Sequence, residues 1–492
     1  MIKTALFVLC ISLFISPVFS QKAKPTHSIP TPDIEAIITT YLGNHHRNYY
    51  GDKAPDKLDV IWKFNLGNGE TQIPSKPYDF MLWYGAGWTG QPAIIREDSS
   101  YFLVQPSYSH NLYKINAETG EEVWRYKYDD VIKGSPSFWE NTYTWGDNRF
   151  MIFQGSRKGN QNTINSPTIH SLRAISYLTG KSLWYYNSKR TRCYSRDVDG
   201  SPIVYQDTFY LPLENGYFLI ADPRPDCGTI VNGKNEPKVY DLIKMYTDED
   251  AYKHYNNMIM EASPTLLGDR IYMCSGSGWI KGYNIKTDSV DWAFYTGADM
   301  DGTPVVTNDS CLIVTIEKQY ISGKGGVFKF DPSKPPEKSV VWYFPTENKE
   351  FESWDGGILG SACINDAYIN IADNGLAAVQ AIDGNLYVID HEFTTKDSTL
   401  GPLEKHYYRM PQLAFQYETG PGISTPIMTE NTLLVAGYKG IHLFKYNDLC
   451  NFERVDHYPG IFESTPVFHD GKVYIACRDG YLYCFGEKHV KE

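Results

Sequence analysis

Two similar stretches decide the fold: "YSRDVDGSPIV" runs from Tyr194 to Val204, and "GADMDGTPVV" runs from Gly297 to Val306. Both contain the pattern D-x-D-G-[ST]-P and continue into β-branched residues, which favour strands. Proline is tolerated at the first residue of a strand, where its missing N–H costs no ladder hydrogen bond. Each stretch therefore predicts a strand that begins at its proline, and their similarity indicates a repeated unit.

The same kind of strand start occurs eight times along the chain. The starts are Pro92, Pro136, Pro202, Pro264, Pro304, Ala362, Pro426 and Pro466. A second strand, a glycine turn and a third strand follow, as in "RDGYLYCFG" from Arg478, and such turns are strong hairpin signals. We predict an all-β protein, a single eight-bladed β-propeller of four-stranded antiparallel blades over residues 58–487. The count becomes seven if the segment at Ala362 is not a blade.

The two ends of the repeat region predict how the ring closes. "LDVIWKFNLG", from Leu58, reads as a fourth strand with no first three strands before it. The last blade, from Pro466 to Gly486, has three strands and then ends. Because open sheet edges are a liability, we expect the N-terminal strand to pair with the last blade and complete the ring.

The outer strands carry a recognisable signature. "INAETGEEVWRY" from Ile115 and "AISYLTGKSLWYY" from Ala174 place Thr-Gly four residues before a tryptophan. They resemble the PQQ-like repeat of the quinoprotein alcohol dehydrogenase-like propellers, which also builds the propeller lipoprotein of the outer-membrane β-barrel assembly machinery. The resemblance implies that each tryptophan packs between neighbouring blades.

The chain start predicts export. Residues 1–20 have a short basic region, an apolar stretch and small residues before a cleavage site near Ser20, as in a signal peptide. We expect a secreted or periplasmic protein with no transmembrane segment, and a net charge of −12 argues against nucleic acid as a partner. Residues 21–57 are predicted to be an extension with a short helix over 32–43 and a polar linker, and residues 488–492 a tail.

Acidic residues recur where one blade leads to the next. Asp197, Asp199, Asp299 and Asp301 lie in such connections, as do Glu261 and Asp355. In a propeller these connections gather at one mouth of the central channel. The four aspartates are therefore candidates for holding a divalent cation such as calcium. Two alternatives stay open: the carboxylates cap tight turns, or Asp299 or Asp301 acts as a catalytic base.

The same connections are rich in aromatic and basic residues. Aromatic faces stack on rings while polar groups orient a ligand, which predicts a small-molecule, glycan or protein ligand at this funnel. Arginine suits a carboxylate or sulfate group of the ligand. Two alternatives stay open: the arginines are ordinary surface charges, and the aromatic loops pack on each other and close the channel. The candidate binding residues are Trp83, Trp88, Arg192, Tyr194, Arg196, Asp197, Asp199, Glu261, Trp354 and Asp355, and His254 is a further catalytic candidate.

Three functions remain open from the sequence. The first is a ligand-binding or protein-interaction scaffold. The second is a PQQ- and calcium-dependent dehydrogenase, which the resemblance implies; the absence of an adjacent cysteine pair argues against PQQ itself. The third is a polysaccharide lyase-like enzyme, with His254 or Tyr255 as base and Arg192 or Arg196 neutralising a uronate.

Overall fold

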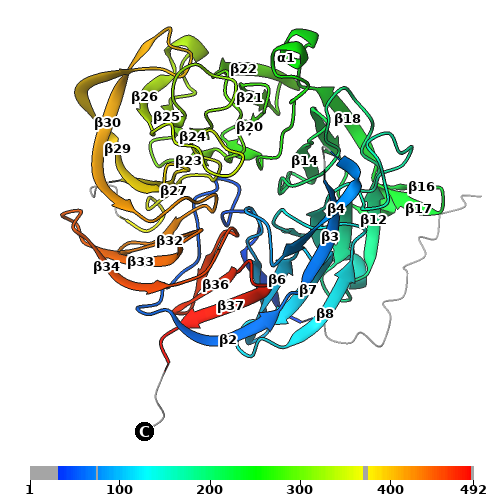
Figure 1. The fold of residues 1–492 in the computed structure, drawn as a ribbon. Coiled ribbons are helices and arrows are strands. Elements are labelled where there is room, and N and C mark those ends of the chain that lie inside the picture. The colour runs from blue at the N-terminus through cyan, green and yellow to red at the C-terminus, as the bar shows by residue number, and fades with distance from the viewer. Residues whose placement is uncertain (1–31, 74–75, 370–374, 489–492) are drawn as a thin grey trace, which may run out of the picture.

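The computed structural model describes residues 32–73, 76–369 and 375–488, so the predicted signal peptide and most of the predicted tail lie outside the described residues. Eight antiparallel sheets stand around a central axis, which confirms the eight-bladed propeller (Figure 1). The segment at Ala362 does lead into a blade, so the count is eight and not seven. None of the helices in the described residues has the length and apolar character needed to cross a bilayer.

Each blade has four strands, ordered from the axis outwards. Blades 1 to 4 consist of β5 (Ala93–Glu97), β6 (Ser100–Pro106), β7 (Asn111–Asn116) and β8 (Glu122–Lys127); β9 (Ser137–Glu140), β10 (Phe150–Gly155), β11 (Leu172–Ser176) and β12 (Ser182–Tyr186); β13 (Ile203–Tyr205), β14 (Thr208–Pro212), β15 (Tyr217–Ala221) and β18 (Val239–Lys244); β19 (Thr265–Leu267), β20 (Arg270–Cys274), β21 (Trp279–Asn284) and β22 (Ser289–Tyr295).

The second half of the ring repeats this plan. Blades 5 to 8 consist of β23 (Val305–Val306), β24 (Leu312–Ile316), β25 (Gly326–Phe330) and β26 (Val340–Pro345); β27 (Cys363–Ile364), β28 (Leu376–Gln380), β29 (Asn385–Leu400) and β30 (Tyr407–Glu418); β31 (Ile427–Met428), β32 (Thr432–Gly437), β33 (Gly440–Tyr446) and β34 (Phe452–Tyr458); β35 (Val467–His469), β36 (Lys472–Ala476), β37 (Tyr481–Gly486) and β2 (Asp59–Asn65).

The ring closes as predicted. Strand β2 pairs antiparallel with β37, in register from Asp59 opposite Gly486 to Asn65 opposite Tyr481. The last blade therefore takes its outer strand from the beginning of the described chain, and this pairing removes two open edges at once.

The tryptophans of the outer strands join neighbouring blades. The indole Nε1 of Trp62 donates to the carbonyl of Ala117, that of Trp124 to Tyr177, and that of Trp184 to Pro223, at 2.9–3.2 Å. A Cβ on Gly120 would lie 2.9 Å from the Trp62 ring. The Thr-Gly corner of one blade thus packs on the tryptophan of the blade before it, and the glycine is needed because a side chain would meet the ring.

A ring of hydroxyl groups explains the Ser/Thr before each strand. The backbone N–H of Ser201 donates to Ser263, that of Ser263 to Thr303, and that of Thr303 to Ser361, at 2.9–3.0 Å. Each hydroxyl lies one blade further on and is fully buried. These side chains satisfy buried backbone donors around the axis, which stabilises the contact between inner strands.

The N-terminal segment differs from the prediction. Residues 32–43 contain no helix; instead β1 (Ile34–Ile38) pairs antiparallel with β5 at the inner edge of blade 1. The free edge of β5 offers backbone partners, and the β-branched isoleucines of β1 suit a strand. A local pattern of apolar residues could not reveal that this edge was available.

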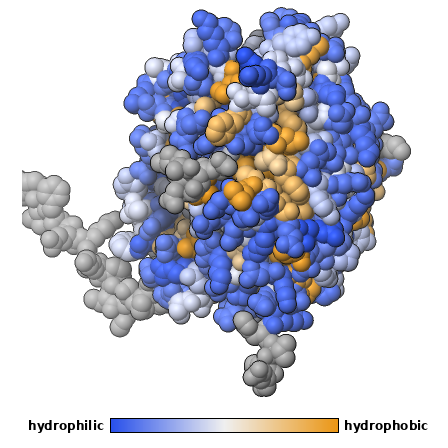
Figure 2. All heavy atoms as spheres, turned by 90° about the vertical axis from the view of Figure 1, so that its left-hand side faces the viewer, coloured by the Kyte–Doolittle hydropathy of each residue, from blue (hydrophilic) through white to orange (hydrophobic). Residues whose placement is uncertain are grey.

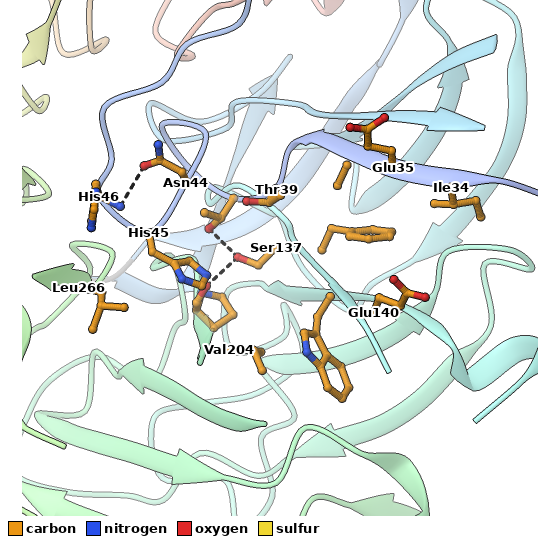
Figure 3. A pocket seen from close by; sticks show the side chains of 15 residues that line it. Ile34, Glu35, Thr39, Asn44, His45, His46, Ser137, Glu140, Val204 and Leu266 are labelled. Carbon is orange, nitrogen blue, oxygen red and sulfur yellow. Dashed lines mark hydrogen bonds between the residues drawn. The ribbon is translucent and has the colours of Figure 1, made fainter. Parts of the chain in front are cut away.

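The stretch predicted to be a polar linker runs along the inner strands and is partly buried there. The N–H groups of Phe138, Leu266, Val306 and Phe468 donate to carbonyls of residues 39–50. Arg47 is fully buried and bonds only to carbonyls and a threonine hydroxyl, so burial lowers the pKa of its guanidinium to about 9. Figure 3 shows this segment beside a cavity of about 690 Å³ lined by Thr39, His45 and Ser137. The chain itself therefore occupies the central channel.

The described residues also contain elements that are not part of the eight blades. They are the hairpin β3 (Asn68–Ile73) and β4 (Lys76–Tyr84), the hairpin β16 (Thr229–Val231) and β17 (Lys234–Glu236), helix α1 (Asp248–Lys253), and the 3-10 turns at Gly146–Asn148, Pro225–Cys227 and Pro336–Lys338. Helix α1 begins with a capping box between Thr247 and Asp250. Among the described residues, seven cysteines form no disulfide: Cys193, Cys227, Cys274, Cys311, Cys363, Cys477 and Cys484.

The long hairpin β29–β30 extends beyond blade 6 and curves over the outer strand of blade 5 (Figure 1). Tyr408 packs on Tyr343 and Phe328, and the carbonyl of Pro402 at its tip accepts from Gly323. The hairpin thus covers the edge of β26.

On the side that carries blades 6 and 7, hydrophobic side chains interrupt a mostly hydrophilic surface (Figure 2).

Candidate functional site

Successive strands of each blade are antiparallel, so loops between second and third strands lie at the same end as the connections between blades. We call this end the funnel face. A cavity of about 990 Å³ opens there. Its walls come from β3–β4, from blades 1 to 3, and from the connection between blades 3 and 4. They include Trp83, Lys133, Arg157, Lys158, Arg190, Arg192, Tyr194, Arg196, Asp197, Glu214, Tyr255 and Glu261.

Six of the predicted binding residues line this one cavity. They are Trp83, Arg192, Tyr194, Arg196, Asp197 and Glu261. Asp199 lies beside it, because its fully buried carboxylate forms an ion pair with Lys133, which lines the wall. The sequence pattern thus identified residues that the fold brings together, although they come from different blades.

The remaining predicted residues lie elsewhere. Trp88 is buried and Trp354 half-buried in an apolar cluster with Leu359, Ile382 and Ile423. This is the aromatic packing that the sequence left open as an alternative. Asp355 is exposed. His254 is 2% exposed, does not line the cavity, and contacts the Tyr295 hydroxyl at 3.2 Å; burial lowers its pKa.

The first D-x-D-G stretch is neutralised by basic residues from blade 2 and the connection before it. Arg157 Nε lies 2.9 Å from the Asp197 carboxylate, and the N–H of Lys158 donates to the same group. Burial opposes ionisation of Asp197, but the charges of Arg157, Lys133 and Lys158 together outweigh it and lower the pKa of that carboxyl. Asp197 is therefore an ion-paired carboxylate and also accepts a backbone hydrogen bond.

Asp199, Glu214 and Glu261 form what we call the Asp199 cluster, with one carboxylate oxygen of each within 4.8 Å of the others. The Lys133 ammonium is the positive charge of this cluster. It forms an ion pair with Asp199 and lies 3.6 Å from a carboxylate oxygen of Glu261. Burial raises the pKa of Glu214 well above its usual range, while the surrounding acids raise the pKa of Lys133 against the effect of its own burial. Glu214 Oε1 and Asp199 Oδ1 are buried without a hydrogen-bond donor.

Asp299, Asp301 and Glu317 form the Asp301 cluster, again within 4.8 Å of one another. Asn257 donates to Asp299 at 2.6 Å, and the Met300 N–H donates to its other oxygen. Glu317 is 2% exposed and its hydrogen-bonding neighbour is the Asp301 carboxyl. Among the described residues, no basic group lies within ion-pair distance of this cluster.

The pKa values of the Asp301 cluster are raised, chiefly because its carboxyls are buried. Burial, followed by the charge of Glu261, raises the pKa of Asp299 to about 7. The same two causes raise the pKa of Asp301 well above its usual range, and burial with the charge of Asp299 does so for Glu317. Three carboxyls in this position hold protons at neutral pH or bind a cation.

Sequence reasoning missed Lys133, Arg157, Glu214 and Glu317. Three of these lie within two residues of the end of a second strand: Arg157 comes after β10, Glu214 after β14 and Glu317 after β24. Aligning the ends of the second strands, and not only the connections between blades, would have shown charged residues recurring at this point. Lys133 lies in a connection without the D-x-D-G pattern, so only the fold reveals its position.

Comparisons with known proteins agree with this architecture. A family model described as "Outer membrane protein assembly factor BamB" matches residues 57–225. Two solved structures cover most of this chain. BamB from Moraxella catarrhalis is 13% identical, and the alignment covers 88% of this chain and 99% of the BamB chain with a TM-score of 0.51. A europium-containing methanol dehydrogenase is 11% identical, and the alignment covers 92% of this chain and 98% of the dehydrogenase chain with a TM-score of 0.58.

A third solved structure, the quinohemoprotein alcohol dehydrogenase from Comamonas testosteroni, is 12% identical, covers 92% of this chain and 81% of its own, and has TM-score 0.53. A search of curated proteins finds no match. Identities this low show the fold alone. Together with the tryptophan contacts between blades, they show a PQQ-like β-propeller fold, and residues 57–225 are similar to the BamB family model.

Proposed function

We propose that this chain is an exported scaffold that binds a ligand or a partner protein in the cavity at its funnel face. The observation that carries the proposal is the cavity itself, about 990 Å³ and walled by elements from several blades. Its size falls in the range of small-molecule sites, and it combines aromatic side chains with charges of both signs.

The positions of the candidate catalytic groups favour binding over chemistry. His254 is buried away from the cavity, and Asp299 is held by Asn257 and the Met300 N–H. A general base must reach the proton that it removes. Tyr255 does line the cavity, with 79% of its surface exposed, but no basic side chain is within hydrogen-bond range of it among the described contacts.

Native mass spectrometry of the exported protein tests the proposal. The expected result is a retained ligand or partner in the wild type that Thr163→Trp displaces, because Thr163 is exposed on the cavity wall and a tryptophan there fills the space. Thr287→Trp is the matched control, since Thr287 is exposed in a turn between third and fourth strands, at the opposite end of the ring. Equal ligand retention by both variants would contradict the proposal.

The Asp301 cluster supports a second candidate, a PQQ- and cation-dependent dehydrogenase. Its three carboxylates lack a basic partner among the described residues, which suits a hard cation with oxygen ligands. A methanol dehydrogenase of the same fold is described as containing europium. Asp299, Asp301 and Glu317 would hold such an ion, which would act there as a Lewis acid.

The Asp301 cluster suits the ion, whereas the cysteines argue against the quinone. No two of the nine cysteines in the sequence are adjacent. Adding PQQ with calcium or europium, and following both the quinone absorbance and alcohol-dependent dye reduction, tests this candidate. Dye reduction by the wild type and its loss in Asp301→Asn would establish the dehydrogenase and displace the scaffold proposal.

A further inference from the structure

The basic residues on the cavity wall fall into two groups. Lys133 and Arg157 are ion-paired with the buried acids Asp199 and Asp197. Lys158, Arg190 and Arg196 also line the cavity, but no described carboxylate lies within ion-pair distance of them. Three basic side chains without an ion pair at one cavity are unexpected in a chain whose net charge is −12.

Arg196 is fixed in place by its neighbours. Its guanidinium donates to the carbonyls of Ser188, Ile164 and Ser166, and the residue is 1% exposed. Burial, and then the like charge of Arg190, lower the pKa of Arg196. Carbonyl groups orient this cation but do not neutralise it, so it creates a preorganised positive potential in the wall.

Arg190 and Lys158 are the more accessible partners of this group. Arg190 is exposed and bonds to the Asn165 side chain and to two carbonyls of its own loop. Lys158 is half-buried, and the loss of solvation lowers the pKa of its ammonium. An anion placed between these groups would relieve both the repulsion and the desolvation. Arg192 does not belong to this group, because it pairs with Asp248.

The same cavity also has buried acceptors that lack donors. Gln72 Oε1 and Glu214 Oε1 are buried without a hydrogen-bond partner, and both residues line the wall. A matching ligand must therefore bring hydroxyl donors as well as an anionic group. Inorganic sulfate has no such donors. The exposed rings of Tyr194 and Tyr255 add the aromatic surface on which sugar rings pack.

We propose that Lys158, Arg190 and Arg196 form an anion subsite, and that the ligand of this cavity is an acidic saccharide whose carboxylate or sulfate group binds there. The inference rests on the proposed function, since it names the ligand class of the same site. The sugar hydroxyls satisfy Gln72 and Glu214, and the acidic group satisfies the three cations.

Calorimetric titration with digalacturonate, its dimethyl ester and inorganic sulfate tests the subsite. We expect the free acid to bind about tenfold or more tightly than the ester, because a charge-assisted contact is lost in the ester. The Lys158→Met/Arg190→Met variant should remove that preference, together with the salt dependence of binding. Lys181→Met/Lys189→Met is the control, since both lysines are exposed and lie outside the cavity wall.

Each outcome decides one level of the proposal. Equal binding of acid and ester, or a preference that survives in the double variant, would overturn the anion subsite. Binding of the ester that Thr163→Trp blocks would then leave the scaffold function standing. Tight binding of sulfate alone would identify a simple anion site and overturn the saccharide. If none of the three probes binds at millimolar concentration, the saccharide inference fails, while native mass spectrometry still decides the proposed function. Circular dichroism and melting temperatures confirm that each variant folds.

Discussion

The two D-x-D-G corners of this propeller share a sequence and differ in their charge balance. Asp199 pairs with Lys133, and Asp197 pairs with Arg157. Asp299 and Asp301 lie with Glu317 and have no basic partner among the described contacts. The comparison teaches that a repeated motif sets where a carboxylate lies in the ring, whereas the neighbouring blade decides whether it is neutralised.

Removing Lys133 should have the largest effect. Lys133→Met leaves the buried Asp199 carboxylate without its counter-charge, and loss of one partner of a buried pair costs about 3–5 kcal/mol of unfolding free energy. Urea denaturation measures the change. Lys439→Met removes an exposed pair with Glu418 and should cost less than about 1 kcal/mol. A loss of similar size in both variants would show that the Asp199 cluster does not depend on its lysine.

Adding a cation should distinguish the two corners. Calcium or terbium at about 100 times its dissociation constant should stabilise the wild type by about 2.7 kcal/mol. Melting temperature and terbium luminescence, sensitised by nearby Tyr320, report binding. Asp301→Asn should abolish both signals and Asp248→Asn, at an exposed position, neither. Binding that persists in Asp301→Asn would place the cation outside the Asp301 cluster.

The pH dependence of stability follows from the raised pKa values of the Asp301 cluster. The folded state keeps protons that the unfolded chain releases near its ordinary carboxyl pKa, so this contribution is present at low pH and is lost as the pH rises. With the pKa of Asp299 at about 7, the unfolding free energy should fall by about 2 kcal/mol between pH 5 and pH 7 in the absence of cations. Denaturation at several pH values measures this.

A control variant isolates the source of that dependence. Asp299→Asn removes the carboxyl of this cluster whose pKa is about 7 and should make the profile shallower, whereas wild-type and Asp248→Asn profiles should coincide. If Asp299→Asn keeps the wild-type slope, the protons are held elsewhere, for example at Glu214 in the Asp199 cluster.

The smallest effect is expected at Arg192. Its side chain is 52% exposed and pairs with the exposed Asp248 at 3.3 Å. Arg192→Ala should change the unfolding free energy by less than about 1 kcal/mol, because exposed ion pairs contribute little. Thermal denaturation compares this variant with Arg157→Ala, which breaks the buried ion pair with Asp197 and should destabilise the fold more. A large loss from Arg192→Ala would mean that the rim is more constrained than its exposure indicates.

Local signals were sufficient for the ring. Proline at strand starts, glycine at hairpins and tryptophan on outer strands are each tied to backbone geometry, so they predicted eight blades and the pairing of β2 with β37. The prediction of a helix over 32–43 was wrong, because the free edge of β5 and the empty channel exist only after the ring forms.

The sequence by itself determined the repeat, the closure of the ring and the gathering of Arg196, Asp197 and Glu261 at one cavity, since these depend on strand order alone. Only the tertiary structure decided which acids are paired, which basic side chains lack an ion pair and that residues 39–50 run along the inner strands. The physical reason is that charge compensation acts over a few ångströms between blades, and residues such as Lys133 and Asp199 come within that distance only through the packing of the ring.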